Sequence, residues 1–460
     1  MDDKLPAPLP TPLPAPLRDL LRQKLVDSWQ QPLPRLTRRD TWIPRIPGKT
    51  LAVIGMRRSG KTSLLWQEVA RRLEAGAERS WLPMLSLEDE RLLIHSPGVD
   101  LLDQLLETYF QLQPQARQVG AQRGCLFLDE IQRIPGWEGF VRRVMDSEPI
   151  DVVVSGSSAE MLSSEIASNL RGRAVEAVVY PFSFRESLRH LGLEPQQPST
   201  HWSSAERSRL AHQLELYLHC GGFPEVQGME ERSRQLLLGS YVDSTVLRDV
   251  IERHAIRQPL ALQWLVRQLL SNGGGGFSLN KLHGALKSQG LAIGREHLAE
   301  LVLHLESAFL IRCVGVVGGS LRRQMALPRK VYPIDPGLLS LYELEGRSNR
   351  GHALETVVLL ELQRRGAEVG YLRTSSGFEV DFHARFPDGR RELIQVCADL
   401  TDPATWQREL RALLEALQEP PGHGAQARLI SLDNKAMASS NAVASSKAVA
   451  WSNAVAWLLE

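Results

Sequence analysis

Residues 55–62, GMRRSGKT, constrain the fold more than any other part of the chain. They carry the glycine, glycine, lysine and threonine of the phosphate-binding loop G-x-x-x-x-G-K-[ST] at every fixed position. The apolar run TLAVIG (50–55) before the loop predicts a buried strand, and SLLWQEVARRLEAG (63–76) after it predicts a helix that ends at Gly76. Strand, loop and helix in this order predict an α/β fold with a parallel sheet covered by helices on both faces.

The loop predicts a site for ATP and Mg²⁺. Backbone N–H groups of the loop and of the helix N-terminus would surround the β-phosphate. Lys61 would reach the β- and γ-phosphates, and Thr62 would bind Mg²⁺. The predicted ATP-binding residues are Gly55, Met56, Arg57, Arg58, Ser59, Gly60, Lys61, Thr62 and Ser63.

A second apolar strand, CLFLDE (125–130), ends in two carboxylates. Asp129 is predicted to hold Mg²⁺ together with Thr62, and Glu130 to polarise the attacking water. Such a pair favours hydrolysis over nucleotide binding alone. The alternative is an acid pair that opens the next helix.

The stretch DVVVSGSS (151–158) predicts another core strand, and WLPMLSLEDE (81–90) predicts a further one. Ser155 and Ser157 are candidates for a sensor of the γ-phosphate, although a plain polar strand end has the same pattern. Arg171 and Arg173 follow in LRGRAVEAVVYPFSFRE (170–186). In a ring of subunits one of them could reach the neighbour's γ-phosphate, and the alternative is an ordinary surface arginine.

Composition excludes several classes of protein. The net charge of +1 over 460 residues provides no global attraction to nucleic acid or membranes. The four cysteines lack zinc-ligand spacing, which suits a reducing cytoplasm. No apolar run reaches membrane-spanning length, and the start MDDK lacks the pattern of a signal peptide. We therefore expect a cytoplasmic protein of two to four domains that does not bind membranes.

Changes in pattern along the chain predict six segments. Residues 1–39 form a proline-rich arm and a short helix, 40–200 the P-loop ATPase core, and 201–240 a helical lid. Residues 241–340 predict a winged-helix domain, with helices near 279–287 and at 295–307. Residues 341–434 predict a nuclease-like domain, and 435–460 hold four imperfect copies of a hexapeptide. We interpret these copies as an expanded tail, whose Trp451 and Trp457 pack on the last domain.

The winged-helix segment is basic, because residues 241–330 hold twelve Lys/Arg and six Asp/Glu. This local charge favours contact with DNA through one face. The alternative is a module that binds protein or packs on the ATPase core. Candidates for DNA contact are Arg295 and His297 in the second helix and Arg322, Arg323, Arg329 and Lys330 in the wing.

The nuclease-like segment carries an incomplete catalytic set. Glu355 on a helix and Asp381 on a strand match a restriction-type core, in which carboxylates hold Mg²⁺ and an E-x-K motif follows on the next strand. Here that motif is replaced by Gln395 and Cys397, so a metal ligand and the lysine are missing. The pattern predicts a nuclease-like fold with a disabled site.

Several motifs together resemble a known family. They are GMRRSGKTSLL, CLFLDEIQRIPGWE, VVVSGSSAEML, LRGRAVEAVVYPFSFRE, GGFPE, YPIDPGLL, RGHALETVV and GFEVDF. The chain resembles the bacterial AAA-type P-loop ATPases that carry a C-terminal nuclease-like domain, of PD-(D/E)xK type and unknown function. The resemblance implies an ATP–Mg²⁺ site and a winged helix between two larger domains. Many members have a lysine on the last strand, where this chain has Cys397.

Three functions are compatible with these features. The first is an oligomeric, ring-forming DNA motor or remodeller that hydrolyses ATP on duplex or branched, Holliday-junction-like DNA. The second is a signalling or defence ATPase that nucleotide binding switches between two states and that docks a protein partner. The third is a nuclease whose site is active despite Gln395 and Cys397. The acid pair, the two arginines and the basic segment favour the first.

Overall fold

The computed structural model describes residues 15–94, 98–118, 123–157, 170, 172–291, 293–318, 327–342, 350–433 and 448–460. It divides into two compact units. The first contains Met1–Leu36, Thr41–Gly55 and Gly60–Val179, and the second contains Thr37–Asp40, Met56–Ser59 and Tyr180–Glu460. The predicted lid, winged-helix and nuclease-like segments therefore lie in one unit.

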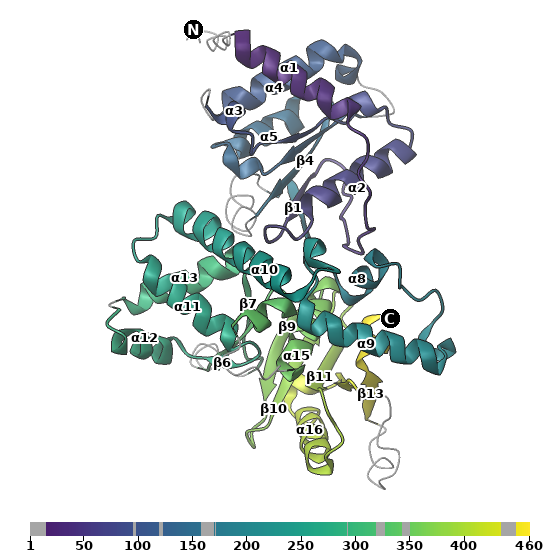
Figure 1. Ribbon diagram of the computed structural model, residues 1–460, viewed down its shortest axis with the longest axis vertical. Coiled ribbons are helices and arrows are strands. Elements are labelled where there is room, and N and C mark those ends of the chain that lie inside the picture. Colours follow the sequence, from purple (N-terminus) through teal and green to yellow (C-terminus); the bar gives the residue numbers. More distant parts are fainter. Residues whose placement is uncertain are drawn as a thin grey trace, which may run out of the picture. The chain divides into compact units, whose positions relative to one another are not determined.

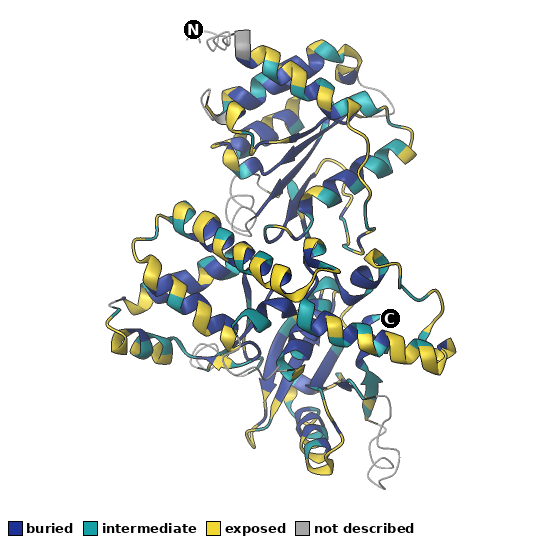
Figure 2. Ribbon diagram, viewed as in Figure 1, coloured by how far each residue is buried: buried dark blue, intermediate teal, exposed yellow. Residues whose placement is uncertain are grey.

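The first unit is built on a five-stranded sheet in the order β2-β3-β4-β1-β5, with every neighbouring pair parallel. Strand β4 lies between the strand that leads into the phosphate loop and the strand that ends in the acid pair. The central strands are apolar because they are buried on both faces (Figure 2). The strands are β1 (Thr50–Ile54), β2 (Met84–Ser86), β3 (Cys125–Asp129), β4 (Asp151–Gly156) and β5 (Ala174–Val178).

Helices cover this sheet (Figure 1). Helix α1 buries Leu17, Leu21 and Leu25 at helical spacing and packs on α4 and β2. Helix α2 begins directly after the phosphate loop, and Gly76 follows it with φ of +92°, as a C-terminal glycine cap requires. The helices are α1 (Ala15–Gln30), α2 (Lys61–Glu74), α3 (Glu90–Leu93), α4 (Val99–Leu112) and α5 (Trp137–Ser147).

The second unit begins with helices α8 (Phe184–His190), α9 (Ser204–Cys220) and α10 (Glu231–Thr245), which continues into the π-helix η6 (Val246–Glu252). The next part combines three helices with an antiparallel sheet in the order β6-β8-β7. Two of these helices match the predicted ranges closely. The elements are α11 (Pro259–Ser271), β6 (Gly276–Phe277), α12 (Leu279–Ser288), α13 (Arg295–Ser307), β7 (Ile311–Val314) and β8 (Arg329–Pro333).

The last part contains a five-stranded sheet in the order β13-β12-β11-β10-β9. Strands β9, β10 and β11 are antiparallel, whereas β12 and β13 run parallel to β11. The elements are α15 (Arg350–Arg364), β9 (Glu368–Arg373), β10 (Glu379–Arg385), β11 (Arg391–Cys397), α16 (Pro403–Ala416), β12 (Gln426–Ser431), β13 (Val449–Asn453) and α17 (Ala454–Leu458).

The last two hexapeptide copies are part of the C-terminal sheet, which corrects the prediction that residues 435–460 form a tail apart from it. The last copies form β13 and α17, and β13 pairs with β12. Trp457 is 2% exposed in the core, and the indole N–H of Trp451 donates to the Ser431 hydroxyl at 3.1 Å. Burial of Trp457 and the hydrogen bond of the half-buried Trp451 explain why alanine-rich copies can complete a sheet. The first two copies lie outside the described residues.

Three sequence motifs meet at the buried carboxylate of Asp335. The N–H of Gly222 donates to Asp335 Oδ2 at 2.6 Å, and the N–H of Gly337 donates to Oδ1 at 2.9 Å. The carbonyl of Gly222 accepts from the N–H of Phe182. A Cβ atom at Gly222 would lie 2.1 Å from the Phe182 carbonyl oxygen, so only glycine fits. Burial raises the pKa of Asp335 to about 7.

Within the described ranges, no helix combines the length and the hydropathy that crossing a membrane requires.

Candidate active site

The phosphate loop connects β1 to α2. Gly60 is the N-cap of α2 and has φ of +104°, a left-handed conformation that favours glycine. Lys61 is therefore the first residue of the helix, where unpaired N–H groups attract anions. Arg58, with φ of +65°, also takes the left-handed conformation, which is strained for a residue with a side chain.

The structure brings the loop and the acid pair together. Lys61 Nζ lies 3.4 Å from Glu130 Oε1, and the side chains of Lys61 and Glu130 are at least nine-tenths buried. The Thr62 hydroxyl donates to Asp129 Oδ2 at 2.7 Å. The lysine and the threonine of the loop each meet one carboxylate at the end of β3.

Ser155 on β4 supports this acid pair. Its hydroxyl donates to Asp129 Oδ1 and accepts the backbone N–H of Glu130 at 3.1 Å. Burial raises the pKa of Asp129, while the hydroxyls of Ser155 and Thr62 oppose that shift by donating to the carboxylate. Ser155 thus holds the backbone and the side chain of the acid pair in place.

Ser157 occupies a different position, which separates the two serine candidates. The side-chain amide of Gln132 donates to Glu130 Oε2 at 2.5 Å and to Ser157 Oγ at 3.3 Å. Our sequence analysis missed Gln132. The only signal was a polar residue two positions after Glu130, in a short 3₁₀ turn that has no periodic pattern.

These residues fit ATP with Mg²⁺. Thr62 and Asp129 offer the hydroxyl and carboxylate oxygens that Mg²⁺ prefers, and Lys61 offers a buried cation at a helix N-terminus. The side chains of the two loop arginines have other partners, within the second unit. Arg57 forms two hydrogen bonds with Asp249, at 2.8 and 3.2 Å, and Arg58 lies 3.8 Å from Glu225.

Of the two arginine-finger candidates, Arg173 does not lie beside the phosphate loop of its own chain. Arg173 precedes β5, and Ala174 pairs with Thr50 at the start of β1. The loop follows Ile54 at the other end of that strand. Arg173 lies at the amino edge of the sheet and forms an ion pair with Asp146. Arg171 lies outside the described residues.

The predicted DNA-contact residues have different environments. Arg295 is exposed at the start of α13, and His297 Nδ1 lies 3.2 Å from Glu300. Arg329 stacks over the Phe277 ring at 5.3 Å. Arg322 and Arg323 lie outside the described residues.

The placement of Lys330 as a wing residue facing DNA is wrong. Lys330 is 6% exposed, and its Nζ lies 2.9 Å from Glu379 Oε1 and 3.0 Å from Asp381 Oδ1. Although burial opposes it, the charges of Asp381, Glu355 and Glu379 hold the pKa of Lys330 above its usual value. This lysine is part of a buried ion cluster.

Two of the predicted nuclease-like residues, Glu355 and Asp381, belong to that ion cluster. Glu355 accepts the Tyr332 hydroxyl hydrogen at 3.2 Å, and burial together with the Asp381 charge raises the pKa of Glu355 to about 8. Gln395 donates to Glu409 at 2.7 Å, and Cys397 donates to the Asp399 carbonyl. We call Lys330, Glu355, Glu379 and Asp381 the C-terminal ion cluster.

The lysine of this cluster, Lys330, belongs to β8, and Glu379 and Asp381 belong to β10. The described part of the chain contains no group of three or more His, Cys, Asp or Glu side chains placed to hold a metal ion.

The fold and the first-unit site define an AAA-type P-loop ATPase. A family model described as an AAA domain matches residues 47–188, and one described as a domain of unknown function (DUF8612) matches residues 211–348. The uncharacterized protein MJ1544 of Methanocaldococcus jannaschii is 30% identical over 406 residues, 87% of this chain and 86% of that protein. The chain belongs to the same family as this relative.

An uncharacterized protein of Haemophilus influenzae is 29% identical over 339 residues, 73% of this chain and 79% of that protein. Among solved structures, the Walker-type ATPase paby2304 of Pyrococcus abyssi has a TM-score of 0.39 and 17% identity, covering 71% of this chain and 95% of that chain. The Aeropyrum pernix ORC1 protein, solved in complex with DNA, has a TM-score of 0.30 and 17% identity, covering 72% of this chain and 93% of that chain.

Proposed function

We propose that the chain hydrolyses ATP in the presence of Mg²⁺ at the first-unit site. The observation that carries this proposal is the pairing of Lys61 with Glu130 and of Thr62 with Asp129. Lys61 faces Glu130, and Thr62 faces Asp129. An ATP–Mg²⁺ complex would take the place of these contacts. Lys61 would then contact the phosphates, and the oxygens of Thr62 and Asp129 would hold the metal ion.

Glu130 then acts as the general base. It takes a proton from the water that attacks the γ-phosphorus, and the bond from that phosphorus to the β–γ bridging oxygen breaks. Mg²⁺, when bound, neutralises charge on the phosphate oxygens. Ser155 holds the Asp129 carboxylate and the Glu130 backbone in place during hydrolysis.

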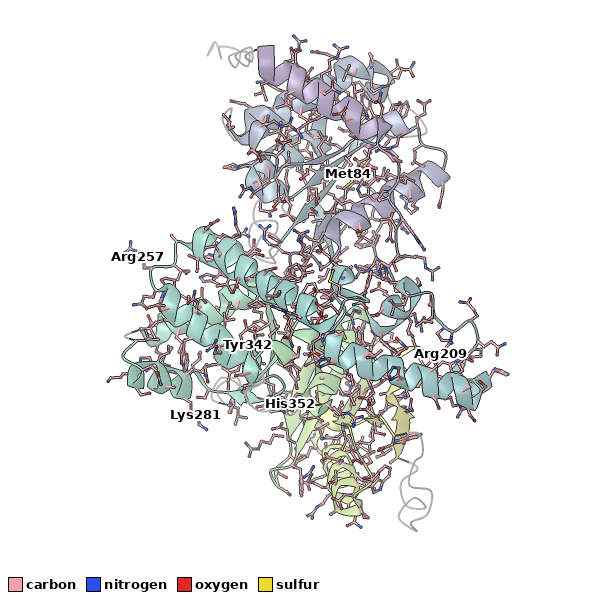
Figure 3. All side chains as sticks on the ribbon, in the orientation of Figure 1. Met84, Arg209, Arg257, Lys281, Tyr342 and His352 are labelled. Atoms are coloured by element: carbon pink, nitrogen blue, oxygen red, sulfur yellow. The ribbon has the colours of Figure 1, made fainter. Side chains whose placement is uncertain are left out.

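We further propose that a homo-oligomer couples this turnover to duplex or branched DNA. Support comes from exposed cations in the helical part of the second unit. Arg295 begins α13, while Lys281 and Lys287 are exposed on α12. Figure 3 labels Lys281 on this helix. Basic side chains on one face supply the contacts with phosphates that dominate DNA affinity.

One observation favours a second function. Lys330 and Arg329, predicted as DNA contacts, are engaged within the protein. Their removal from the basic surface favours a nucleotide-switched ATPase that docks a protein partner and does not move DNA.

The steady-state ATPase rate distinguishes these functions. It is measured without DNA and with single-stranded, duplex and four-way-junction DNA, with Lys61→Ala as the blank. We expect hydrolysis above the blank and at least a tenfold stimulation by one DNA form. Hydrolysis that is slow and indifferent to all three forms establishes the switch. If no hydrolysis is found with or without any form of DNA, the proposal that the chain hydrolyses ATP is wrong.

Charge reversal tests the DNA surface. Arg295→Glu is expected to weaken DNA binding about tenfold at low salt and to reduce the salt dependence of binding, because a contact with a phosphate is lost. Arg209→Glu is the matched control, since Arg209 is exposed on α9, away from α12 and α13 (Figure 3). Equal affinities of the two variants would remove α13 from the DNA surface.

A further inference from the structure

The side chain of Gln132 links the predicted general base to β4. One amide nitrogen donates to Glu130 Oε2 at 2.5 Å and to Ser157 Oγ at 3.3 Å. The orientation of the amide follows from charge, because the reverse orientation would place its carbonyl oxygen against the carboxylate. Gln132 therefore holds Glu130 by one oxygen.

The other end of the same amide has no partner. Gln132 Oε1 is buried and accepts no hydrogen bond from any residue that the structure describes. A buried carbonyl without a donor costs free energy, so such an atom calls for an explanation. Its neighbour Glu130 has a strained backbone, with φ of +56°. Strain and an unsatisfied acceptor thus lie together at the reacting edge of the sheet.

We propose that Gln132 is a catalytic residue that orients Glu130 and the attacking water. The inference rests on the proposed ATP hydrolysis. When Lys61 leaves Glu130 Oε1 for the phosphates, Gln132 keeps hold of Oε2, so Oε1 faces the water. The carbonyl oxygen of Gln132 accepts the second hydrogen of that water.

The proton balance of the step is complete without another reactant. The water oxygen bonds to the γ-phosphorus, and one water proton passes to Glu130. The bond to the bridging oxygen breaks, which leaves ADP and phosphate. The hydrogen bonded to Gln132 stays on the oxygen that becomes part of the phosphate. Gln132 gains and loses no proton, and its contribution is orientation.

The test compares single-turnover hydrolysis and ATP affinity in the full-length chain. Gln132→Ala is expected to lower the hydrolysis rate about 30- to 100-fold, within the range for a positioned proton-transfer group, and to change ATP affinity less than twofold. Gln132→Glu keeps the size of the side chain but places a second carboxylate against Glu130, and we expect at least the same loss. The control is Arg133→Ala, the exposed next residue of the same turn, which should match the wild type.

A double-mutant cycle separates catalysis from a structural role. If Gln132 acts with Glu130 on one water, Glu130→Gln and the double variant Glu130→Gln/Gln132→Ala hydrolyse ATP at rates within about twofold of each other. Multiplied losses in the double variant overturn the inference, as does a wild-type rate in Gln132→Ala. If the wild-type chain fails to exceed the Lys61→Ala blank, the proposed function itself fails, and this inference fails with it.

Discussion

Both units hold a buried lysine among carboxylates, but the two lysines are held differently. Lys61 lies 3.4 Å from Glu130, beyond the 2.7–2.9 Å that is typical of a close charged hydrogen bond. Lys330 makes contacts of 2.9 and 3.0 Å with two carboxylates and has a third, Glu355, nearby. The first lysine belongs to a glycine-rich loop, whereas the second belongs to a strand.

The difference separates a site for chemistry from a structural cluster. The loose pair at Lys61 can exchange its partners for phosphate at little cost, because Glu130 keeps its hydrogen bond from Gln132. Lys330 cannot leave without exposing Asp381 and Glu355 as unpaired buried acids. The C-terminal ion cluster therefore connects β8 to β10, and we interpret it as part of the framework of the second unit.

Removing Lys61 should affect function more than any other change. Lys61→Ala is expected to lower ATP turnover by about 10³-fold or more, because the cation that stabilises the phosphates is lost. An ATPase assay with a nucleotide-binding titration measures this effect. The control is Lys49→Ala, an exposed lysine before β1. Turnover that survives in Lys61→Ala would mean that hydrolysis occurs elsewhere.

Removing Lys330 should affect stability instead. Lys330→Met is expected to destabilise the second unit by about 3–5 kcal/mol, the usual cost of breaking a buried ion pair from one side. Urea unfolding of the full chain, followed by circular dichroism, measures the shift, and the ATPase rate without DNA should stay within twofold. Lys281→Met, an exposed lysine on α12, is the control. An unchanged unfolding midpoint would show that the cluster is not structural.

The same contrast explains what could be predicted from the sequence. The fold of the first unit and the four residues Lys61, Thr62, Asp129 and Glu130 follow from contiguous motifs, since a phosphate loop and an acid-ended strand are local patterns. Gln132 could not be found, because a polar residue in a short turn has no periodicity. Its second contact, Ser157, follows β4 and lies 25 residues further along the chain.

In the second unit the signals were less local. Lys330 pairs with Asp381, which lies 51 residues further along the chain and in another sheet. A count of charges along the sequence therefore treats Lys330 as an exposed cation. The packing of Trp457 on the last domain was predicted, but the pairing of β13 with β12 was not, since the repeat pattern does not indicate which strand the copies join. Contacts between distant segments decide burial, and a local charge count cannot.

A double substitution sharpens the structural interpretation of Lys330. Lys330→Met/Asp381→Asn should regain about 2–3 kcal/mol of what Lys330→Met loses, because removing both charges leaves no unpaired ion between them. The measurement is again the urea midpoint of the second unit. Failure to regain stability would show that Lys330 acts through packing and not through its charge.

The pH dependence of stability is the finest test of the cluster. Burial and the Asp381 charge raise the pKa of Glu355 to about 8, above its unfolded value near 4.5. The folded chain therefore keeps a proton that the unfolded chain loses, so stability falls as pH rises from about 4.5 to about 8. Between pH 6.5 and 8 this group alone should remove about 1.6 kcal/mol, because the slope of about 1.4 kcal/mol for each pH unit falls by half as the pH reaches the folded pKa.

Glu355→Gln should remove that contribution, because the amide does not titrate. Urea midpoints at pH 6.5 and 8 for the two proteins measure the difference between their slopes. Asp335, with its pKa of about 7, adds a slope of the same sign in both proteins, so the comparison between them isolates Glu355. Parallel slopes would mean that Glu355 is ionised beside Lys330 at pH 6.5. The C-terminal ion cluster would then hold two buried, ionised carboxylates, Glu355 and Asp381, balanced by one lysine. It would resemble the Lys61 site more closely than the lysine–carboxylate distances of the two sites indicate.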